Sequence, residues 1–223
     1  MINVMRILLS NDDGYSSLGI EMLASTLEDI ADVTVVAPER DRSGASNSLT
    51  LDRPLSLHRA PSGFFFVNGT PTDCVHLAVT GMLDHLPDMV ISGINPHGNL
   101  GHDITYSGTV TAAMEAAITG IKGIAVSLES PDGHKGALDY STAAIVARHV
   151  AERVIANGLP EDVVVNVNVP YLKEAELKGY MITRQGLRVY RDALDSRRDP
   201  RGKPYYWIGG DAPTGVPESG TDV

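Results

Sequence analysis

The chain has 223 residues, a formal net charge of -10 and 43% apolar residues, which is the composition of an ordinary soluble globular protein. The acidic balance argues against a nucleic-acid polymer or an anionic membrane surface as its partner. The chain has a single cysteine, Cys74, which cannot form an internal disulfide. A metal site built from several cysteines is therefore not expected. Neither a secretory leader nor an apolar run of membrane-spanning length is evident, so we expect a cytoplasmic protein without membrane contact.

Strand-like and helical patterns alternate through the first three-quarters of the chain. Short apolar runs that are typical of buried strands occupy residues 5–10, 33–37, 89–92, 123–128 and 163–169. Helical patterns lie between them, at 17–30, from 69–73 through 79, at 110–118 and at 137–156. Strands that alternate with helices form crossover connections in a largely parallel sheet. We therefore predict an α/β fold with a mostly parallel sheet and helices on both faces.

The last part of the chain has a different character. Residues 180–207 alternate polar and apolar side chains and hold 7 of the 18 Lys and Arg residues. A basic nucleic-acid-binding arm fits this composition, but the segment lacks the groove-binding motifs of such arms. We favour a β-hairpin extension that forms subunit contacts. The domain prediction is an α/β catalytic core at 1–180 and a hairpin extension and tail for oligomerisation at 181–223, with the natural chain expected to continue past Val223.

Two adjacent carboxylates end the first predicted strand. Asp12 and Asp13 directly follow the apolar run. Two adjacent carboxylates repel each other and are strongly hydrated, so the packing of an apolar strand does not explain why they stand at its end. A divalent cation such as Mg²⁺, Mn²⁺ or Ca²⁺ would remove both objections, because these ions take hard oxygen ligands. These residues alone leave open whether the pair holds a metal ion or belongs to an Asx-rich turn that ends at Gly14.

Two further polar loops follow predicted strands and are expected at the same edge of the sheet. One covers residues 38–48 and contains Ser43, and the other covers 92–103 and contains Asn95 and Asn99. Each loop leaves its strand at the carboxyl end, where open parallel sheets bind ligands. Carboxylates, hydroxyls and side-chain amides would then converge as an oxygen-ligand metal site that keeps several waters.

Ser107, Gly108 and Thr109 precede the predicted apolar helix at 110–118. Unpaired backbone N–H groups and the positive end of the helix dipole would attract an anion there, and Gly108 would let a phosphate approach the backbone. Plain N-capping by Ser107 or Thr109 explains the same residues without any ligand. Both interpretations stay open at this point.

Taken together, these segments resemble the survival protein SurE family. The resemblance rests on motifs that occur in order along nearly the whole chain, at 11–14, 42–50, 69–75, 92–95, 98–101 and 106–110. It implies a Rossmann-like α/β core with a C-terminal hairpin and tail that build homodimers and often homotetramers. It also implies a metal-dependent phosphatase that acts on nucleoside 5′- and 3′-monophosphates. Departures from the family pattern at Pro96, His97, His102 and Ala116 leave the implied metal ligands in place.

The resemblance also implies roles for particular residues. The implied ligands of one divalent ion per subunit, Mg²⁺ or Mn²⁺, are Asp12, Asp13, Ser43 and Asn95. The implied neighbours of the substrate phosphate are Asn99, Ser107, Gly108 and Thr109. The expected reaction is hydrolysis of a phosphomonoester by a metal-bound water that Asp12 or Asp13 orients or deprotonates. Asn99 and Ser107 would stabilise charge on the phosphoryl oxygens.

Two other functions remain open from the residues. A receiver-like regulatory domain also gathers acidic residues after its first strand, but it needs a phosphoacceptor Asp where this chain has Ile91, Ser92 and Gly93. A nucleotide-binding module without turnover would carry the same loops. The preferred base, the choice between the 5′ and 3′ positions, and activity on short polyphosphate are not decided by the sequence.

Overall fold

The computed structural model describes residues 5–131 and 133–223, which divide into two compact units. The first unit takes the chain to Asn99 and then Ile104–Lys178, and the second holds Leu100–Asp103 and Gly179–Val223. Within the described ranges, no helix is long and apolar enough to cross a membrane.

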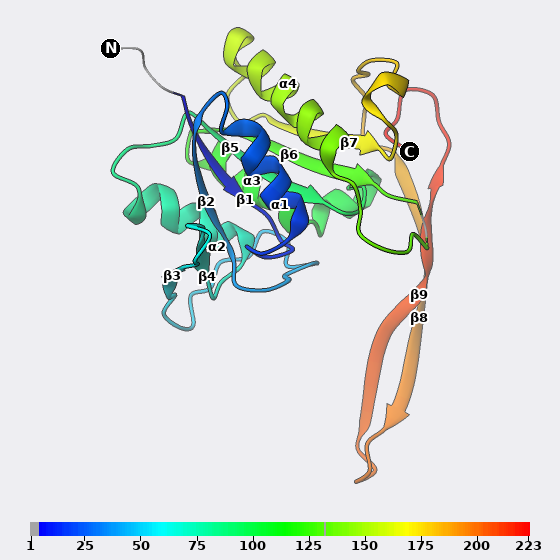
Figure 1. The fold of residues 1–223 in the computed structure, drawn as a ribbon. Coiled ribbons are helices and arrows are strands. Elements are labelled where there is room, and N and C mark those ends of the chain that lie inside the picture. The colour runs from blue at the N-terminus through cyan, green and yellow to red at the C-terminus, as the bar shows by residue number, and fades with distance from the viewer. Residues whose placement is uncertain (1–4, 132) are drawn as a thin grey trace. The chain divides into compact units, whose positions relative to one another are not determined.

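Apart from the short strands β3 and β4, the helices and strands of Figure 1 follow one another in the order that the sequence patterns predict. The strands are β1 (Arg6–Ser10), β2 (Asp32–Pro38), β3 (Leu57–Arg59), β4 (Phe65–Val67), β5 (Met89–Asn95), β6 (Lys122–Glu129), β7 (Val164–Pro170), β8 (Leu187–Arg198) and β9 (Pro204–Val216). The helices are α1 (Leu18–Leu27), α2 (Pro71–Leu77), α3 (Gly108–Ile118) and α4 (Ser141–Asn157). Short helical turns are η1 (Ala78–Met82), η2 (Gly101–Thr105) and η3 (Glu174–Glu176).

Seven strands of the first unit form one sheet in the order β3-β4-β2-β1-β5-β6-β7. All neighbours run parallel except β3 and β4, which pair antiparallel at one side of the sheet. The predicted α/β fold with a mostly parallel sheet is confirmed. The sequence patterns missed β3 and β4, because strands of three residues are too short to show a period. The helix predicted to start at residue 137 starts at Ser141.

Helices cover both faces of this sheet because its strands alternate their side chains between two cores. In β1, Ile7 and Leu9 pack in the core that contains residues of α1 and α4, whereas Leu8 packs in the core that contains residues of α2 and α3. Burial of each such side chain contributes about 1.5–3 kcal/mol. Figure 1 shows α1 and α4 side by side on one face of the sheet, in agreement with this division.

The loops that follow β1, β2 and β5 leave the sheet at one edge. Parallel pairing puts Ser10 opposite Ser92, so the carboxyl ends of β1 and β5 lie next to each other. Asp12 follows β1 at this edge, and Asn95 ends β5 after a shift of register between Ser92 and Asn95. The candidate site is therefore assembled where open parallel sheets bind their ligands.

The second unit is built on the antiparallel hairpin of β8 and β9, which pairs from Leu187 opposite Val216 to Arg198 opposite Pro204. The alternating sequence pattern ends near Trp207, but β9 continues to Val216. A two-stranded hairpin with both faces exposed does not require alternating apolar side chains. The sequence pattern can therefore end before the strand ends. Within this unit Asp222 accepts hydrogen bonds from the N–H of Gly101 (2.9 Å) and of Gly186 (2.6 Å).

Candidate active site

Asp12 follows β1 in the chain, and its buried carboxylate contacts the first turn of α3 in space. The residue is 4% exposed, and its Oδ1 accepts a hydrogen bond from the Thr109 hydroxyl. Its backbone carbonyl accepts a hydrogen bond of 2.7 Å from the N–H of Arg42 in the loop after β2. Burial raises the pKa of Asp12, whereas hydrogen bonds from the side chain and backbone of Thr109 lower it. Three of the predicted site segments therefore meet at this residue.

Gly108 permits this contact because its missing side chain leaves room for Asp12. A Cβ atom at Gly108 would lie 2.7 Å from the Cβ of Asp12 and 3.0 Å from the Cγ of Pro71. Both distances are shorter than the roughly 3.5–4.0 Å of favourable carbon contacts. In the structure the missing side chain lets Asp12 approach the start of α3, and the approach of a phosphate to the Gly108 backbone stays a prediction.

Asp13 presents a buried oxygen without a partner. Its Oδ2 makes no hydrogen bond to any of the described residues. Burial, followed by the charges of Asp12 and Asp41, raises the pKa of Asp13 to about 7. Burial and then the charge of Asp13 raise the pKa of Tyr140, which precedes α4, to about 12. A buried carboxylate oxygen of this kind is stabilised either by a proton or by a cation.

Ser43 lies in the loop after β2, where Asp41 holds it. The Asp41 Oδ1 accepts hydrogen bonds of 2.7 Å from both the N–H and the hydroxyl of Ser43. The charge of Asp41 also raises the pKa of Asp12 and of Asp13, which indicates that it lies near the pair. The sequence analysis missed Asp41. The spacing Asp-x-Ser is the signal that indicates it, because an Asp side chain bonds readily to the backbone two residues on.

Asn95 is partly buried at the end of β5. Its Nδ2 donates a hydrogen bond of 2.5 Å to the carbonyl oxygen of His97, which orients the amide within its own loop. Because β5 pairs with β1, Asn95 lies at the same sheet edge as Asp12 and Asp13.

Asn99 is fixed by polar side chains of β6 and β7. The Oδ1 of Asn168 accepts a hydrogen bond from the Asn99 N–H (2.8 Å), and its Nδ2 donates to the Asn99 carbonyl (3.2 Å). The same carbonyl accepts a hydrogen bond from Asn166, and the Asn99 Nδ2 donates to the Ser127 hydroxyl. One N–H of the Asn99 amide is therefore bound to Ser127, and the contact of Asn99 with the phosphate stays a prediction. These three partners were not predicted from the sequence, although asparagine at alternate positions of a valine-rich strand indicates a polar face.

Ser107 caps α3. Its Oγ accepts a hydrogen bond of 3.1 Å from the Val110 N–H, as the capping interpretation predicts. Its carbonyl accepts hydrogen bonds from the N–H and the hydroxyl of Thr111, which close the first turn of the helix. Capping uses the Ser107 hydroxyl, whereas anion binding uses the backbone N–H groups of the first helical turn. One of these groups, the N–H of Thr109, bonds to Asp12. The two interpretations of this segment therefore involve different atoms and are compatible.

The donor atoms at this edge are those of an oxygen-ligand cation site. Asp12 and Asp13 supply carboxylates, and the unpartnered Oδ2 of Asp13 has the chemistry of a ligand atom. The described part of the chain contains no cluster of three or more His, Cys, Asp or Glu that could hold a metal ion. Neutral oxygens, as in Ser43 and Asn95, would have to complete a shell. The residues present thus fit a hard ion such as Mg²⁺ or Mn²⁺ better than zinc.

Comparison with known proteins relates the chain to one family. The profile of the family described as survival protein SurE matches residues 7–192. Two proteins named 5′-nucleotidase SurE match 98% of this chain: one from Nitrosomonas eutropha, 56% identical over 87% of its own length, and one from Methylococcus capsulatus, 52% identical over 85%. A crystal structure of a SurE protein from Aquifex aeolicus has a TM-score of 0.81 at 43% identity and covers 97% of this chain and 87% of that one. The chain therefore belongs to the survival protein SurE family.

Proposed function

We propose that the chain is a 5′-nucleotidase that hydrolyses nucleoside monophosphates to nucleoside and inorganic phosphate and requires a divalent cation. The observation that carries this proposal is the buried Asp12–Thr109 contact with the unpartnered Asp13 oxygen beside it. Two adjacent carboxylates, of which Asp12 contacts the N-terminus of α3, repel a phosphate unless a cation neutralises them, whereas the helix N-terminus itself attracts a phosphate. The name that the relatives share, 5′-nucleotidase SurE, supports the same activity.

The metal ion would be Mg²⁺ or Mn²⁺, one per subunit, held by Asp12, Asp13, Ser43 and Asn95. When bound, such an ion polarises a phosphoryl oxygen and acidifies a water molecule. Asp41 would act from outside this ligand set, because its Oδ1 already accepts two hydrogen bonds from Ser43 and thereby orients that serine.

The remaining steps fall to the chain's own residues. The start of α3 stabilises negative charge on the phosphoryl oxygens through its dipole and through the N–H groups of Ser107 and Gly108, since the N–H of Thr109 already bonds to Asp12. Asp13 accepts the proton of the attacking water through the carboxylate oxygen that does not hold the ion, and the leaving nucleoside oxygen takes a proton from solvent water. Thr109 holds Asp12 in place. Asn99, whose Nδ2 donates to Ser127, positions the loop that leads to Ser107.

The substrate range extends in this proposal to nucleoside 3′-monophosphates and short polyphosphate, because the residues assigned above recognise the phosphoryl group. The proposed location is the cytoplasm, where nucleoside monophosphates arise from nucleic-acid turnover.

The proposal also includes assembly into a homodimer or homotetramer through the hairpin. Large apolar side chains are exposed on β8 and β9, among them Leu194 (63%), Trp207 (65%) and Ile208 (88%). Surfaces with several such side chains are typical of subunit interfaces. The core at 1–180 would then carry catalysis, and the extension at 181–223 would carry assembly. Sedimentation velocity of the wild type and of Ile208→Glu tests this, with a smaller species expected for the variant.

The activity is tested by phosphate release with Mg²⁺ or Mn²⁺ from nucleoside 5′- and 3′-monophosphates, ribose 5-phosphate and short polyphosphate. We expect the fastest release from nucleoside monophosphates and a strong loss in Asp12→Asn. A receiver-like domain would instead be labelled stoichiometrically by acetyl phosphate without turnover. A nucleotide-binding module would bind nucleotide without releasing phosphate. Either of these two outcomes contradicts the proposed function.

A further inference from the structure

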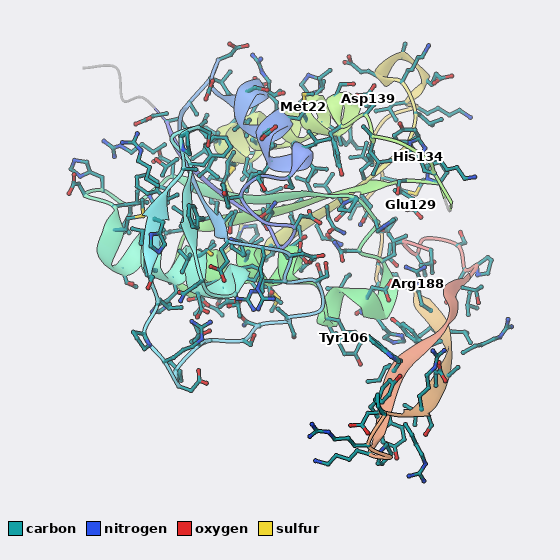
Figure 2. All side chains as sticks on the ribbon, turned by 60° about the horizontal axis from the view of Figure 1, so that its bottom comes forward. Met22, Tyr106, Glu129, His134, Asp139 and Arg188 are labelled. Carbon is teal, nitrogen blue, oxygen red and sulfur yellow. The ribbon has the colours of Figure 1, made fainter. Side chains whose placement is uncertain are left out.

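Ser46, in the loop between β2 and β3, bonds to two successive carbonyl groups that precede α3. Its N–H donates to the carbonyl of Tyr106 (3.2 Å), and its hydroxyl donates to the carbonyl of Thr105 (2.8 Å). Tyr106 is 63% exposed and lies at the surface of the molecule, as Figure 2 shows. Ser46 thus holds the backbone of this surface segment from one side.

These two hydrogen bonds determine how the peptide groups before α3 are turned. In a trans peptide the C=O and the N–H point in opposite directions. Because Ser46 binds the carbonyls of Thr105 and Tyr106, the N–H groups of Tyr106 and Ser107 are directed away from Ser46. Ser107 is the residue that caps α3, so Ser46 orients the peptide that leads directly into the proposed phosphate seat.

The loop that carries Ser46 is itself anchored on both sides of this residue. Before it, the Arg42 N–H donates to the Asp12 carbonyl (2.7 Å). After it, the Ser48 carbonyl accepts a hydrogen bond from the Thr70 hydroxyl (2.6 Å) at the start of α2. The backbone on both sides of Ser46 is therefore held in place by hydrogen bonds to other segments.

The backbone of Ser46 has a conformation that favours glycine. Its φ is 53°, in the left-handed region, where a side chain with a Cβ atom is disfavoured. Glycine at this position would relieve strain and keep the N–H donor, but it would remove the hydroxyl. The sequence instead has serine, which retains the bond to Thr105.

We infer that Ser46 is a positioning residue for phosphate binding: it couples the loop that carries Ser43 to the peptide that leads into α3. This inference rests on the proposed function, because it takes the start of α3 as the phosphate seat. It predicts that loss of the Ser46 hydroxyl weakens binding of the phosphoryl group and leaves the chemical step nearly unchanged.

The test compares Ser46→Gly, Ser46→Ala and Ser25→Ala with the wild type. Ser25 is the matched control, because its hydroxyl also donates to a backbone carbonyl, that of Met22 over 3.0 Å, but lies in α1 and not in this loop. We expect both Ser46 variants to raise KM for a nucleoside 5′-monophosphate and the inhibition constant of inorganic phosphate by about two- to tenfold, the range of one hydrogen bond, with kcat within about twofold. We expect Ser25→Ala to leave both constants unchanged.

Thermal unfolding separates this role from a merely structural one. In Ser46→Gly the relieved strain offsets the lost hydrogen bond, so we expect a Tm within about 2 °C of the wild type, whereas Ser46→Ala keeps the strain and unfolds earlier. Equal phosphate inhibition of Ser46→Gly and wild type, or an equal change in Ser25→Ala, would overturn the inference and leave the proposed function standing. If the wild type proved inactive, the proposed function would fail. Phosphate binding by the wild type and the variants would then be compared through the rise of Tm on addition of phosphate.

Discussion

Thr109 donates its hydroxyl hydrogen to the carboxylate of Asp12, a residue 97 positions earlier in the chain. The contact joins the end of the first strand to the start of α3 and buries a charged group at a helix N-terminus. The hydroxyl and the helix dipole both favour the ionised carboxylate, so they offset part of the cost of its burial. The geometry and the charge of the candidate site both depend on this pair.

Replacing Thr109 with valine keeps the branched shape and removes the donor. We expect Thr109→Val to lower the free energy of unfolding by about 1–3 kcal/mol, because a buried carboxylate loses a hydrogen bond, and to lower kcat/KM by about tenfold or more. Thr109→Ser keeps the hydroxyl and is the matched control. Denaturant unfolding and steady-state kinetics provide the measurement, and equal kinetics in the two variants would count against the assigned role.

A methyl group at Gly108 would separate α3 from Asp12. Because the added Cβ would lie 2.7 Å from the Asp12 Cβ, we expect Gly108→Ala to destabilise the fold by about 1–3 kcal/mol and to abolish most activity. Gly81→Ala is the control, since a Cβ at Gly81 has nothing within 4 Å. Thermal unfolding and phosphate release measure both effects. Full activity of Gly108→Ala would show that the close approach is not needed.

The pKa of Asp13, raised from 3.8 to about 7, predicts a pH-dependent stability for the protein in EDTA. A group whose pKa is higher in the folded state stabilises the fold fully below its unfolded pKa, and this contribution is lost as the pH rises through the folded pKa. We therefore expect the free energy of unfolding to fall between about pH 4 and pH 7 relative to Asp13→Asn. The raised pKa of Asp12 acts in the same direction.

Denaturant unfolding of the wild type and of Asp13→Asn at a series of pH values measures this difference. A divalent cation competes with the proton for the same carboxylate, so added Mg²⁺ or Mn²⁺ should stabilise the wild type most near pH 7. A difference between the two proteins that stayed constant, or that grew in favour of the wild type as the pH rose, would contradict the assignment.

Asn168 supports the site from outside through its two hydrogen bonds to the backbone of Asn99. We expect Asn168→Ala to destabilise the protein by about 1–3 kcal/mol, because the N–H of Asn99 loses its partner, and to lower kcat/KM several-fold. Asn157→Ala is the matched control, since Asn157 donates to the Arg153 carbonyl at the end of α4. Unfolding and kinetics of both variants check this, and indistinguishable variants would exclude a supporting role.

Local patterns were sufficient for the order of the strands and helices other than β3 and β4, and for the edge at which the candidate site lies. Both follow from short-range periodicity and from the rule that parallel strands bind ligands at their carboxyl ends. The capping of α3 by Ser107 is also a local feature, and the structure contains it. The roles of Asp12, Asp13, Ser43 and Asn95 as metal ligands remain predictions.

The contacts that refine the site could not be predicted because they join residues far apart in the chain. No local pattern links Asp12 to Thr109, or Asn99 to Asn168, which lies 69 positions away. The bond from the Asn99 amide to Ser127 is likewise absent from any local pattern, and the contact of Asn99 with the phosphate stays a prediction. Asp41 was overlooked because its importance depends on its distance from Asp12 and Asp13, which only the folded loop determines.

The most direct test of the account is phosphate release from a nucleoside 5′-monophosphate by wild type and Asp13→Asn, first in EDTA and then with Mg²⁺ or Mn²⁺ restored. We predict that the wild type is inactive in EDTA and recovers with the metal ion, and that Asp13→Asn recovers little at any metal concentration. Undiminished activity of the wild type in EDTA, or full recovery of Asp13→Asn, would contradict a cation site built on the Asp12–Asp13 pair.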